Sequence, residues 1–130
     1  EFNHAKGEQT HFLQIWIAPA QTGIAPGYEE KHFDADAKRG RLRLIASPDG
    51  DDGSVRIHQD ARLYASLLDA DAPVEHALAP GRRAYVHVAR GSVSVNGVRL
   101  SGGDAAKVEQ EASIILGDAE AAEVLLFDLP

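Results

Sequence analysis

Residues 82–100 read RRAYVHVARGSVSVNGVRL, and this stretch decides the fold. In its second half, valines alternate with serines as far as Val95, and the apolar alternation resumes after Asn96-Gly97. Asn-Gly supplies the positive φ angles of a type I′ turn, whose twist matches the strands that it joins. An earlier β-rich run at residues 85–88 is closed by Gly91. The stretch therefore predicts a β-hairpin preceded by a further strand.

Short apolar or alternating runs recur along the rest of the chain, separated by Gly, Pro and Asp. The earliest, FLQIWIA at residues 12–18, predicts a buried strand that Pro19 stops, with Trp16 substantially buried. Further strands are expected at residues 42–46, 54–58, 62–69, 74–78, 105–109, 112–116 and 123–129, with Gly117-Asp118 as the turn between the last two. Short strands at intervals of about 8 to 12 residues, without an amphipathic helix, predict an all-β sandwich or barrel.

Composition limits the functions that the chain can have. Its 130 residues make one domain or a piece of a two-domain protein. The absence of Cys excludes disulfides and thiolate metal sites and favours a reducing, cytoplasmic location. No apolar run approaches the roughly 20 residues of a membrane span, so no membrane partner is expected. The net charge of −7 argues against a nucleic-acid surface, because such a surface needs clustered Lys and Arg.

Several stretches carry a resemblance to a known family. They are FLQIWIAP at residues 12–19, GYE at 27–29, SVRIHQD at 54–60 and EVLLFDLP at 123–130. In this order they resemble the C-terminal half of pirin-like bicupin proteins, the family that includes bacterial quercetin 2,3-dioxygenases. The resemblance implies a cupin fold, a double-stranded β-helix or jelly-roll barrel, over residues 12–130. It implies that residues 1–11 are the remnant of an N-terminal cupin and linker whose front part is missing.

The resemblance also implies where a metal would be held. In the family, the N-terminal cupin binds one metal through three His and one Glu, and the last ligands lie in a His-x-Glu motif followed by an aromatic residue and Asn. The start of this chain, Glu1-Phe2-Asn3, matches the end of that motif, so Glu1 would be the fourth ligand in the intact parent. The alternative is a cloning remnant, because a common restriction site encodes Glu-Phe. A single carboxylate is not a transition-metal site, which needs several converging ligands.

The second cupin lacks ligand residues at the positions that the general cupin pattern gives. Counted from Gly91, those positions fall on Leu78, Pro80 and Ala84, and the later His falls near Leu116. All four are apolar. We therefore expect no cofactor in this chain and one divalent transition metal in the full-length parent.

The histidines carry weaker signals. His4, His11 and His32 lie in polar segments without a second His at metal-ligand spacing. For His58 we expect a structural hydrogen bond with Asp60 orienting the ring, and for His76 a place at the rim. Tyr85 and His87 share one strand face. They line a small pocket if that face points into the barrel; otherwise His87 is a hydrogen-bonded core or rim residue.

The sequence therefore leaves more than one function open. The first is a metal-free cupin with a structural, covering role in a pirin-like quercetin 2,3-dioxygenase, inactive by itself. The alternative is an interaction or small-ligand-binding module, as in pirin-type regulatory cofactors. The expected partners are the missing N-terminal cupin and a second copy of this chain, which would form a homodimer through the exposed interdomain surface.

Overall fold

The computed structural model describes residues 2–70 and 72–130. The described chain is built almost wholly of strands from residue 43 onward, which confirms the all-β prediction. Among the described residues, no helix has the length and apolar character needed to cross a membrane. In chain order the elements are α1 (Ala35–Lys38), β1 (Arg43–Ser47), a 3₁₀ turn (Asp51–Gly53), β2 (Val55–Arg56), β3 (Arg62–Leu68), β4 (Val74–Ala77), β5 (Arg83–Val95), β6 (Val98–Ser101), β7 (Ala105–Glu109) and β8 (Ser113–Leu129).

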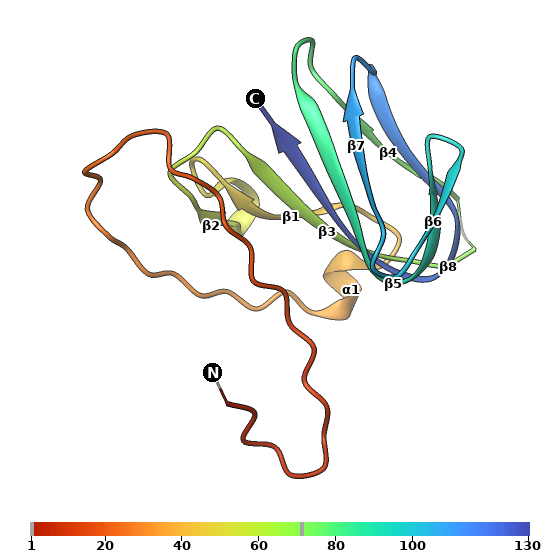
Figure 1. Ribbon diagram of the computed structural model, residues 1–130, viewed down its shortest axis with the longest axis horizontal. Helices are drawn as coiled ribbons and strands as arrows, with labels where there is room; N and C mark the ends of the chain where they lie inside the picture. The colour runs from red at the N-terminus through yellow and green to blue at the C-terminus, as the bar shows by residue number, and fades with distance from the viewer. Residues whose placement is uncertain (1, 71) are drawn as a thin grey trace.

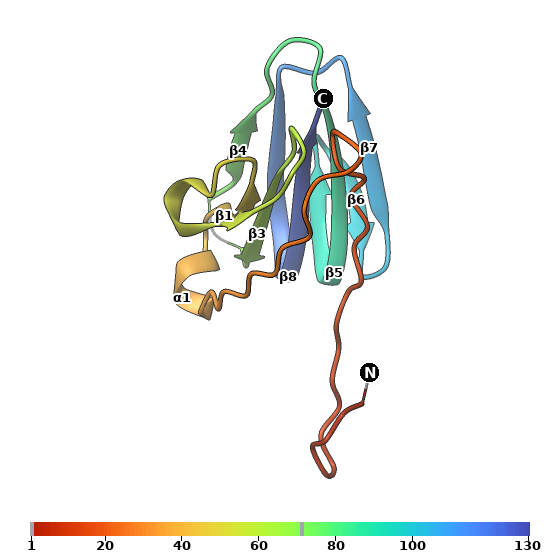
Figure 2. The ribbon, with the colours of Figure 1, turned by 90° about the vertical axis from the view of Figure 1, so that its left-hand side faces the viewer.

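Two long strands, β5 and β8, organise the sheet. Strand β8 pairs antiparallel with β3, β4 and β5, and β5 pairs in turn with β6 and β7. The order across the sheet is β2-β1-β3-β8-β5-β6, with β4 and β7 attached to the two long strands. Because β5 and β8 bend sharply along their length, each contributes to both layers and the sheet curls around one interior (Figures 1 and 2).

The bend has a specific backbone cause. In β5, Gly91 has a φ of 70°, and a Cβ at this position would lie 2.2 Å from the carbonyl oxygen of Ala121. In β8, Asp118 and Ala121 also have positive φ angles, and the register between the two strands shifts repeatedly near the bend. These residues make bulges inside continuous strands. The prediction of a turn at Gly117-Asp118 separating two strands is therefore wrong.

The predicted hairpin is confirmed. Asn96 and Gly97 have φ angles of 46° and 83°, and Val95 pairs with Val98 across the turn. Positive φ at both central positions is the type I′ condition. The side chain of Asn96 also bonds outside the hairpin, since its Oδ1 accepts from the backbone N–H of Ile115 at 2.7 Å. The turn is thus tied to β8 as well as to its own strands.

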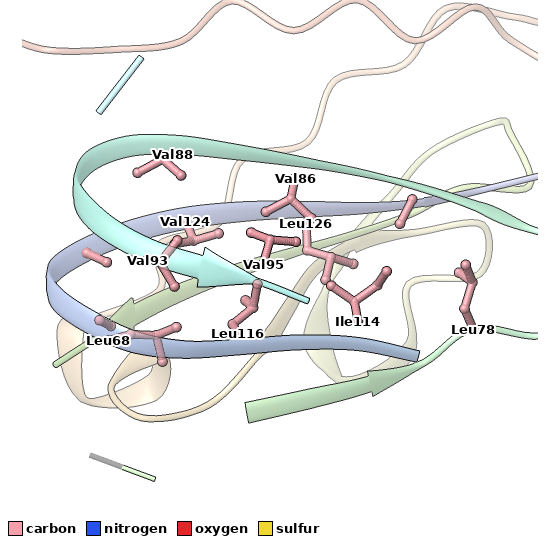
Figure 3. Packing of buried hydrophobic residues seen from close by; sticks show 13 residues of the cluster. Leu68, Leu78, Val86, Val88, Val93, Val95, Ile114, Leu116, Val124 and Leu126 are labelled. Atoms are coloured by element: carbon pink, nitrogen blue, oxygen red, sulfur yellow. The ribbon is translucent and has the colours of Figure 1, made fainter. Parts of the chain in front are cut away.

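The interior of the curled sheet is aliphatic. Alternate residues of β5 and β8, including Val86, Val88, Val124 and Leu126, are fully buried and point into the interior between the layers (Figure 3). Leu68, Leu78, Val93, Val95, Ile114 and Leu116 complete the same cluster. A separate, smaller cluster of Ala46, Leu63 and Phe127 lies on the opposite face of the sheet.

The N-terminal segment departs from the prediction. Residues 12–18 form no strand in the described structure, and Trp16 is 87% exposed instead of buried. The segment runs as an extended chain outside the curled sheet (Figure 1). A strand requires a neighbouring backbone to pair with, and the described residues offer this segment none. The strand expected at residues 54–58 likewise shrinks to β2, which pairs parallel to β1.

Candidate functional site

Tyr85 and His87 line a pocket on the outside of the barrel. In β5 they alternate with Ala84, Val86 and Val88, which are buried in the interior, so their side chains point to the other face of the sheet. The condition that this face points into the barrel is therefore not met. We call the cavity of about 570 Å³ the outer pocket; it is lined by residues 13–18, Gln59, Arg83, Tyr85, His87, Leu125, Phe127, Leu129 and Pro130.

Two sources supply the walls of the outer pocket. The floor is the outer face of β5 and β8, where Tyr85 and Phe127 are paired residues whose rings meet edge to face with centroids 5.7 Å apart. The other wall is the extended N-terminal segment, which is fastened at its end by Gln59 Nε2 donating to the carbonyl oxygen of Ala18 at 2.9 Å. Volumes of this size are typical of small-molecule sites.

The outer pocket has two basic residues in its lining. Its lining contains Arg83 and His87 but no Asp or Glu side chain, although the whole chain has a net charge of −7. The guanidinium of Arg83 is held at one end, where Nε and Nη2 donate to the carbonyl oxygen of Pro130 at 3.1 and 2.7 Å. The pocket can therefore accept an apolar or aromatic group, with the guanidinium of Arg83 at one end.

A buried polar network lies where β5 begins and β8 ends. Asp128 accepts from Arg82 Nε, and its other carboxylate oxygen lies 2.8 Å from His76 Nε2. Arg82 also donates to the carboxylate of Asp60 at 2.9 Å, and the ring of His76 packs against Tyr64 at 4.8 Å. Hydrogen bonding to Asp128 raises the pKa of the Arg82 guanidinium, and burial raises the pKa of the Tyr64 phenol.

Sequence reasoning missed this network. The sequence places His76 at the rim and gives Arg82 no role, whereas the structure joins both side chains to Asp128. Asp60 pairs with Arg82, so the prediction that it orients His58, which is exposed, is wrong. The sequence does contain one sign of this network. Asp128 follows the apolar pair Leu126-Phe127 in the last apolar run, and an acidic residue there needs a partner once the strand is buried.

The positions that the cupin pattern assigns to metal ligands lie mostly in the aliphatic interior. Leu78, Ala84 and Leu116 are buried in the main cluster, while Pro80 is exposed on the loop before β5. Within residues 2–70 and 72–130, no three His, Asp or Glu side chains gather in a way that could hold a metal ion. Glu1, the ligand expected in the intact parent, lies outside the described residues.

Comparisons with known proteins place the chain in a family. Residues 44–129 match the family described as the quercetinase C-terminal cupin domain. The chain is 42% identical over its whole length to quercetin 2,3-dioxygenase of Escherichia coli, and covers 55% of that protein. It is 38% identical to a putative quercetin 2,3-dioxygenase of Pseudomonas aeruginosa, of which it covers 56%. The chain thus spans about half the length of the curated relatives it matches.

Solved structures agree with the sequence matches. The crystal structure of YhhW from Escherichia coli superposes with a TM-score of 0.81 at 42% identity, covering 88% of this chain and 48% of that one. Bacterial pirin YhhW in complex with nickel(II) superposes with a TM-score of 0.79 at 39% identity, covering 86% and 47%. The predicted cupin barrel is confirmed by these superpositions and by the curled sheet. The chain belongs to the family of quercetinase C-terminal cupin domains, within the pirin-like proteins.

Proposed function

We propose that this chain is the metal-free C-terminal cupin of a pirin-like quercetin 2,3-dioxygenase, and that it covers and stabilises the metal-holding cupin. The observation that carries the proposal is the filled interior at the cupin ligand positions, where Leu78, Ala84 and Leu116 are packed among other aliphatic side chains. A dication placed there would have no compensating charge or hydrogen bond. This argues for a structural rather than a catalytic role.

The metal of the parent protein is then expected in the other half. We propose one divalent transition metal per full-length chain, and the nickel(II) complex of bacterial pirin YhhW supports the presence of such a metal. The exposed apolar side chains on the N-terminal segment, Phe12 and Trp16 among them, support a role in contact with that half. Apolar groups gathered on a surface mark interaction sites. We further propose a cytoplasmic location for the parent, as the absence of Cys suggests.

Metal content tests the metal-free part of the proposal. The full-length protein should retain about one nickel per chain after dialysis, and the variants His76→Gln and His87→Gln should retain the same amount. These histidines are chosen because each could contribute a metal ligand in this half. His76 lies in the buried network beside Asp128, and His87 lines the outer pocket. A second tightly held metal, or a stoichiometry that falls in either variant, would place a metal site in this domain.

The covering role is tested by weakening this domain inside the full-length protein. Gly91→Ala should disrupt the bend of β5, while Gly97→Ala changes a turn where a Cβ meets nothing within 4 Å. If this half supports the other, Gly91→Ala lowers the melting temperature of the metal-holding half and speeds nickel loss to a chelator. Gly97→Ala should do neither. If the Gly91→Ala variant loses nickel no faster than the unmodified protein, the covering role is overturned.

A second candidate function is small-ligand binding in the outer pocket. The observation that favours it is an apolar cavity with Arg83, Tyr85 and His87 at its wall and no carboxylate side chain. An anionic aromatic probe, 8-anilinonaphthalene-1-sulfonate, should then bind one site per chain with an affinity that Tyr85→Ala weakens. Tyr28→Ala is the control, because Tyr28 is 86% exposed and away from the pocket. Equal binding to both variants would remove this candidate.

A further inference from the structure

Strand β2 lies at one end of the strand order and pairs with β1 on its inner side. In a strand, the backbone N–H and C=O groups of alternate residues point toward opposite edges. Ile57 donates its N–H to the carbonyl oxygen of Ser47 in β1 at 2.9 Å. Ser54, Arg56 and His58 therefore point toward the outer edge of β2. An outer edge of this kind can pair with a strand of another molecule.

This outer edge is covered by residues 18–31, which we call the strap. The N-terminal part of the chain loops around this end of the sheet (Figure 1). At the far end of the edge, the backbone N–H of Ala20 donates to the carbonyl oxygen of His58 at 2.8 Å. Beside this bond, Gln59 holds the carbonyl oxygen of Ala18. The strap is thus joined to β2 through its own backbone at one end.

Two side chains of the strap, Glu29 and Lys31, contact the rest of the outer edge. The backbone N–H of Arg56 donates to Oε2 of Glu29 at 3.1 Å. The carbonyl oxygen of Ser54, two residues earlier, accepts from Nζ of Lys31 at 2.8 Å. The two side chains therefore supply one acceptor and one donor at alternate residues of β2. A neighbouring strand would supply the same two functions from its backbone.

Glu29 and Lys31 also hold each other in position. Nζ of Lys31 lies 2.8 Å from Oε1 of Glu29, so the two oxygens of the carboxylate have different partners. The hydrogen bond from Lys31, and after it the bond from the N–H of Arg56, lower the pKa of Glu29. The carboxylate is therefore charged at neutral pH. Charged side chains on an edge oppose the approach of a second strand.

We propose that the Glu29–Lys31 pair is a side-chain substitute for a β-strand, which closes the outer edge of β2 and prevents it from pairing with a second copy of this chain. A second copy brings an identical edge, and two such edges related by a two-fold axis can pair as antiparallel strands. Loss of the pair frees the N–H of Arg56 and the C=O of Ser54 together. These are the groups that an incoming strand would bind. The proposal goes beyond the covering role and does not depend on it.

Hydrogen exchange in the full-length protein, measured for single amides by NMR, tests whether the pair covers the edge. In the double variant Glu29→Ala/Lys31→Ala, the amide of Arg56 should exchange at least about 10-fold faster than in the unmodified protein. The amide of Ile57, which bonds to β1 on the inner side, should keep its rate. If both amides exchange faster to the same extent, the pair holds β2 in place instead of covering its edge, and the proposal is overturned. An unchanged rate for Arg56 would also overturn it.

The matched control is Glu30→Ala/Lys38→Ala, which removes one acidic and one basic side chain, as the test variant does. The carboxylate of Glu30 accepts from the exposed Tyr28, and Lys38 lies in α1. Both double variants leave the net charge of the protein unchanged, so a difference between them cannot come from altered repulsion between molecules. The control should show the exchange rates of the unmodified protein.

Sedimentation at increasing concentration tests the protective role. The Glu29→Ala/Lys31→Ala variant should associate at concentrations at which the unmodified protein and the control keep a constant mass. In the associated form the amide of Arg56 should again exchange slowly, because the second copy then occupies the edge. A test variant that associates no more than the control would overturn the proposal. Association in which the amide of Arg56 still exchanges fast would use another surface and would overturn it as well.

Discussion

The guanidinium of Arg82 and the carboxylate of Asp128 form an ion pair across the paired ends of β5 and β8, where the Asp128 side chain is 8% exposed. His76 is hydrogen-bonded to the other oxygen of the same carboxylate. One buried carboxylate therefore contacts two basic side chains. A buried ion pair adds little over a well-packed apolar pair, but removal of one partner leaves an uncompensated charge. The pair therefore makes this end of the barrel sensitive to substitution.

Asp128→Asn should destabilise the domain by about 3 kcal/mol, because Arg82 would keep its charge beside a neutral amide. The control is Asp60→Asn, which removes the other carboxylate that Arg82 contacts. Asp60 is 65% exposed, so its loss should cost less than about 1 kcal/mol. Urea unfolding of the two variants measures the difference in the free energy of unfolding. Equal effects would mean that Asp128 contributes no more than a surface partner.

The variants Gly91→Ala and Gly97→Ala should distinguish two causes of lost stability: the overlap of a new Cβ with neighbouring atoms and the strain of a positive φ angle. Both glycines have positive φ, so alanine is strained at either position by about 1 kcal/mol. Only at Gly91 would the new Cβ also overlap the backbone of Glu120 and Ala121, at 2.4 and 2.2 Å from their carbonyl oxygens. We expect Gly91→Ala to cost at least about 3 kcal/mol or to prevent folding. Circular dichroism during chemical unfolding reports both, and similar midpoints would contradict the tight contact.

The pKa of Tyr64 predicts a loss of stability in alkali. Burial raises the folded pKa of this phenol above its ordinary value near 10. Between the unfolded and folded pKa values the folded state binds more protons, so the free energy of unfolding decreases as pH rises through that window. Tyr64→Phe removes this contribution, and its stability should fall less steeply above about pH 10. Unfolding midpoints measured from pH 8 to 11 check this, and parallel curves would refute it.

The exposed Trp16 gives a direct probe of self-association. It is the only Trp in the chain, so fluorescence of the isolated domain reports one site. If the chain is monomeric, emission should be that of a solvated indole and acrylamide should quench it readily. If the predicted homodimer forms through this surface, emission should shift to the blue as concentration rises, in step with the mass found by sedimentation. A dimer with a fully quenchable Trp16 would use another surface.

Local patterns in the sequence predicted most of the strands because their causes are local. The hairpin follows from the conformational freedom of Asn96-Gly97, and the burial of Val93 and Val95 follows from their alternation with serines. The resemblance to pirin-like proteins supplied the barrel, which alternation alone does not distinguish from a sandwich. The same signals failed where Gly117 and Asp118 produce a bulge, because turn-forming residues inside a long strand also bend it.

The candidate sites depended on contacts that sequence spacing does not contain. Asp128 lies 46 residues from Arg82 and 52 from His76, and only the pairing of β4 and β5 with β8 brings them together. The outer pocket needs the N-terminal segment laid over β5 and β8, a contact that no local pattern specifies. Trp16 was expected inside because an apolar run usually marks a core strand. Among the described residues, however, no backbone pairs with residues 12–17.

The central position of β8 in the sheet also affects how the domain folds during its synthesis. This strand is the last element in the described chain, yet β3, β4 and β5 all require it as their antiparallel neighbour. During synthesis on the ribosome, the edges of β3, β4 and β5 that pair with β8 therefore stay unpaired until residues 113–129 have left the exit tunnel. We therefore expect the sheet to close only after β8 is available, whereas the pairs β1–β3 and β5–β6 do not depend on it. A nascent chain stalled before β8 should be bound by chaperones and open to proteases along most of its length.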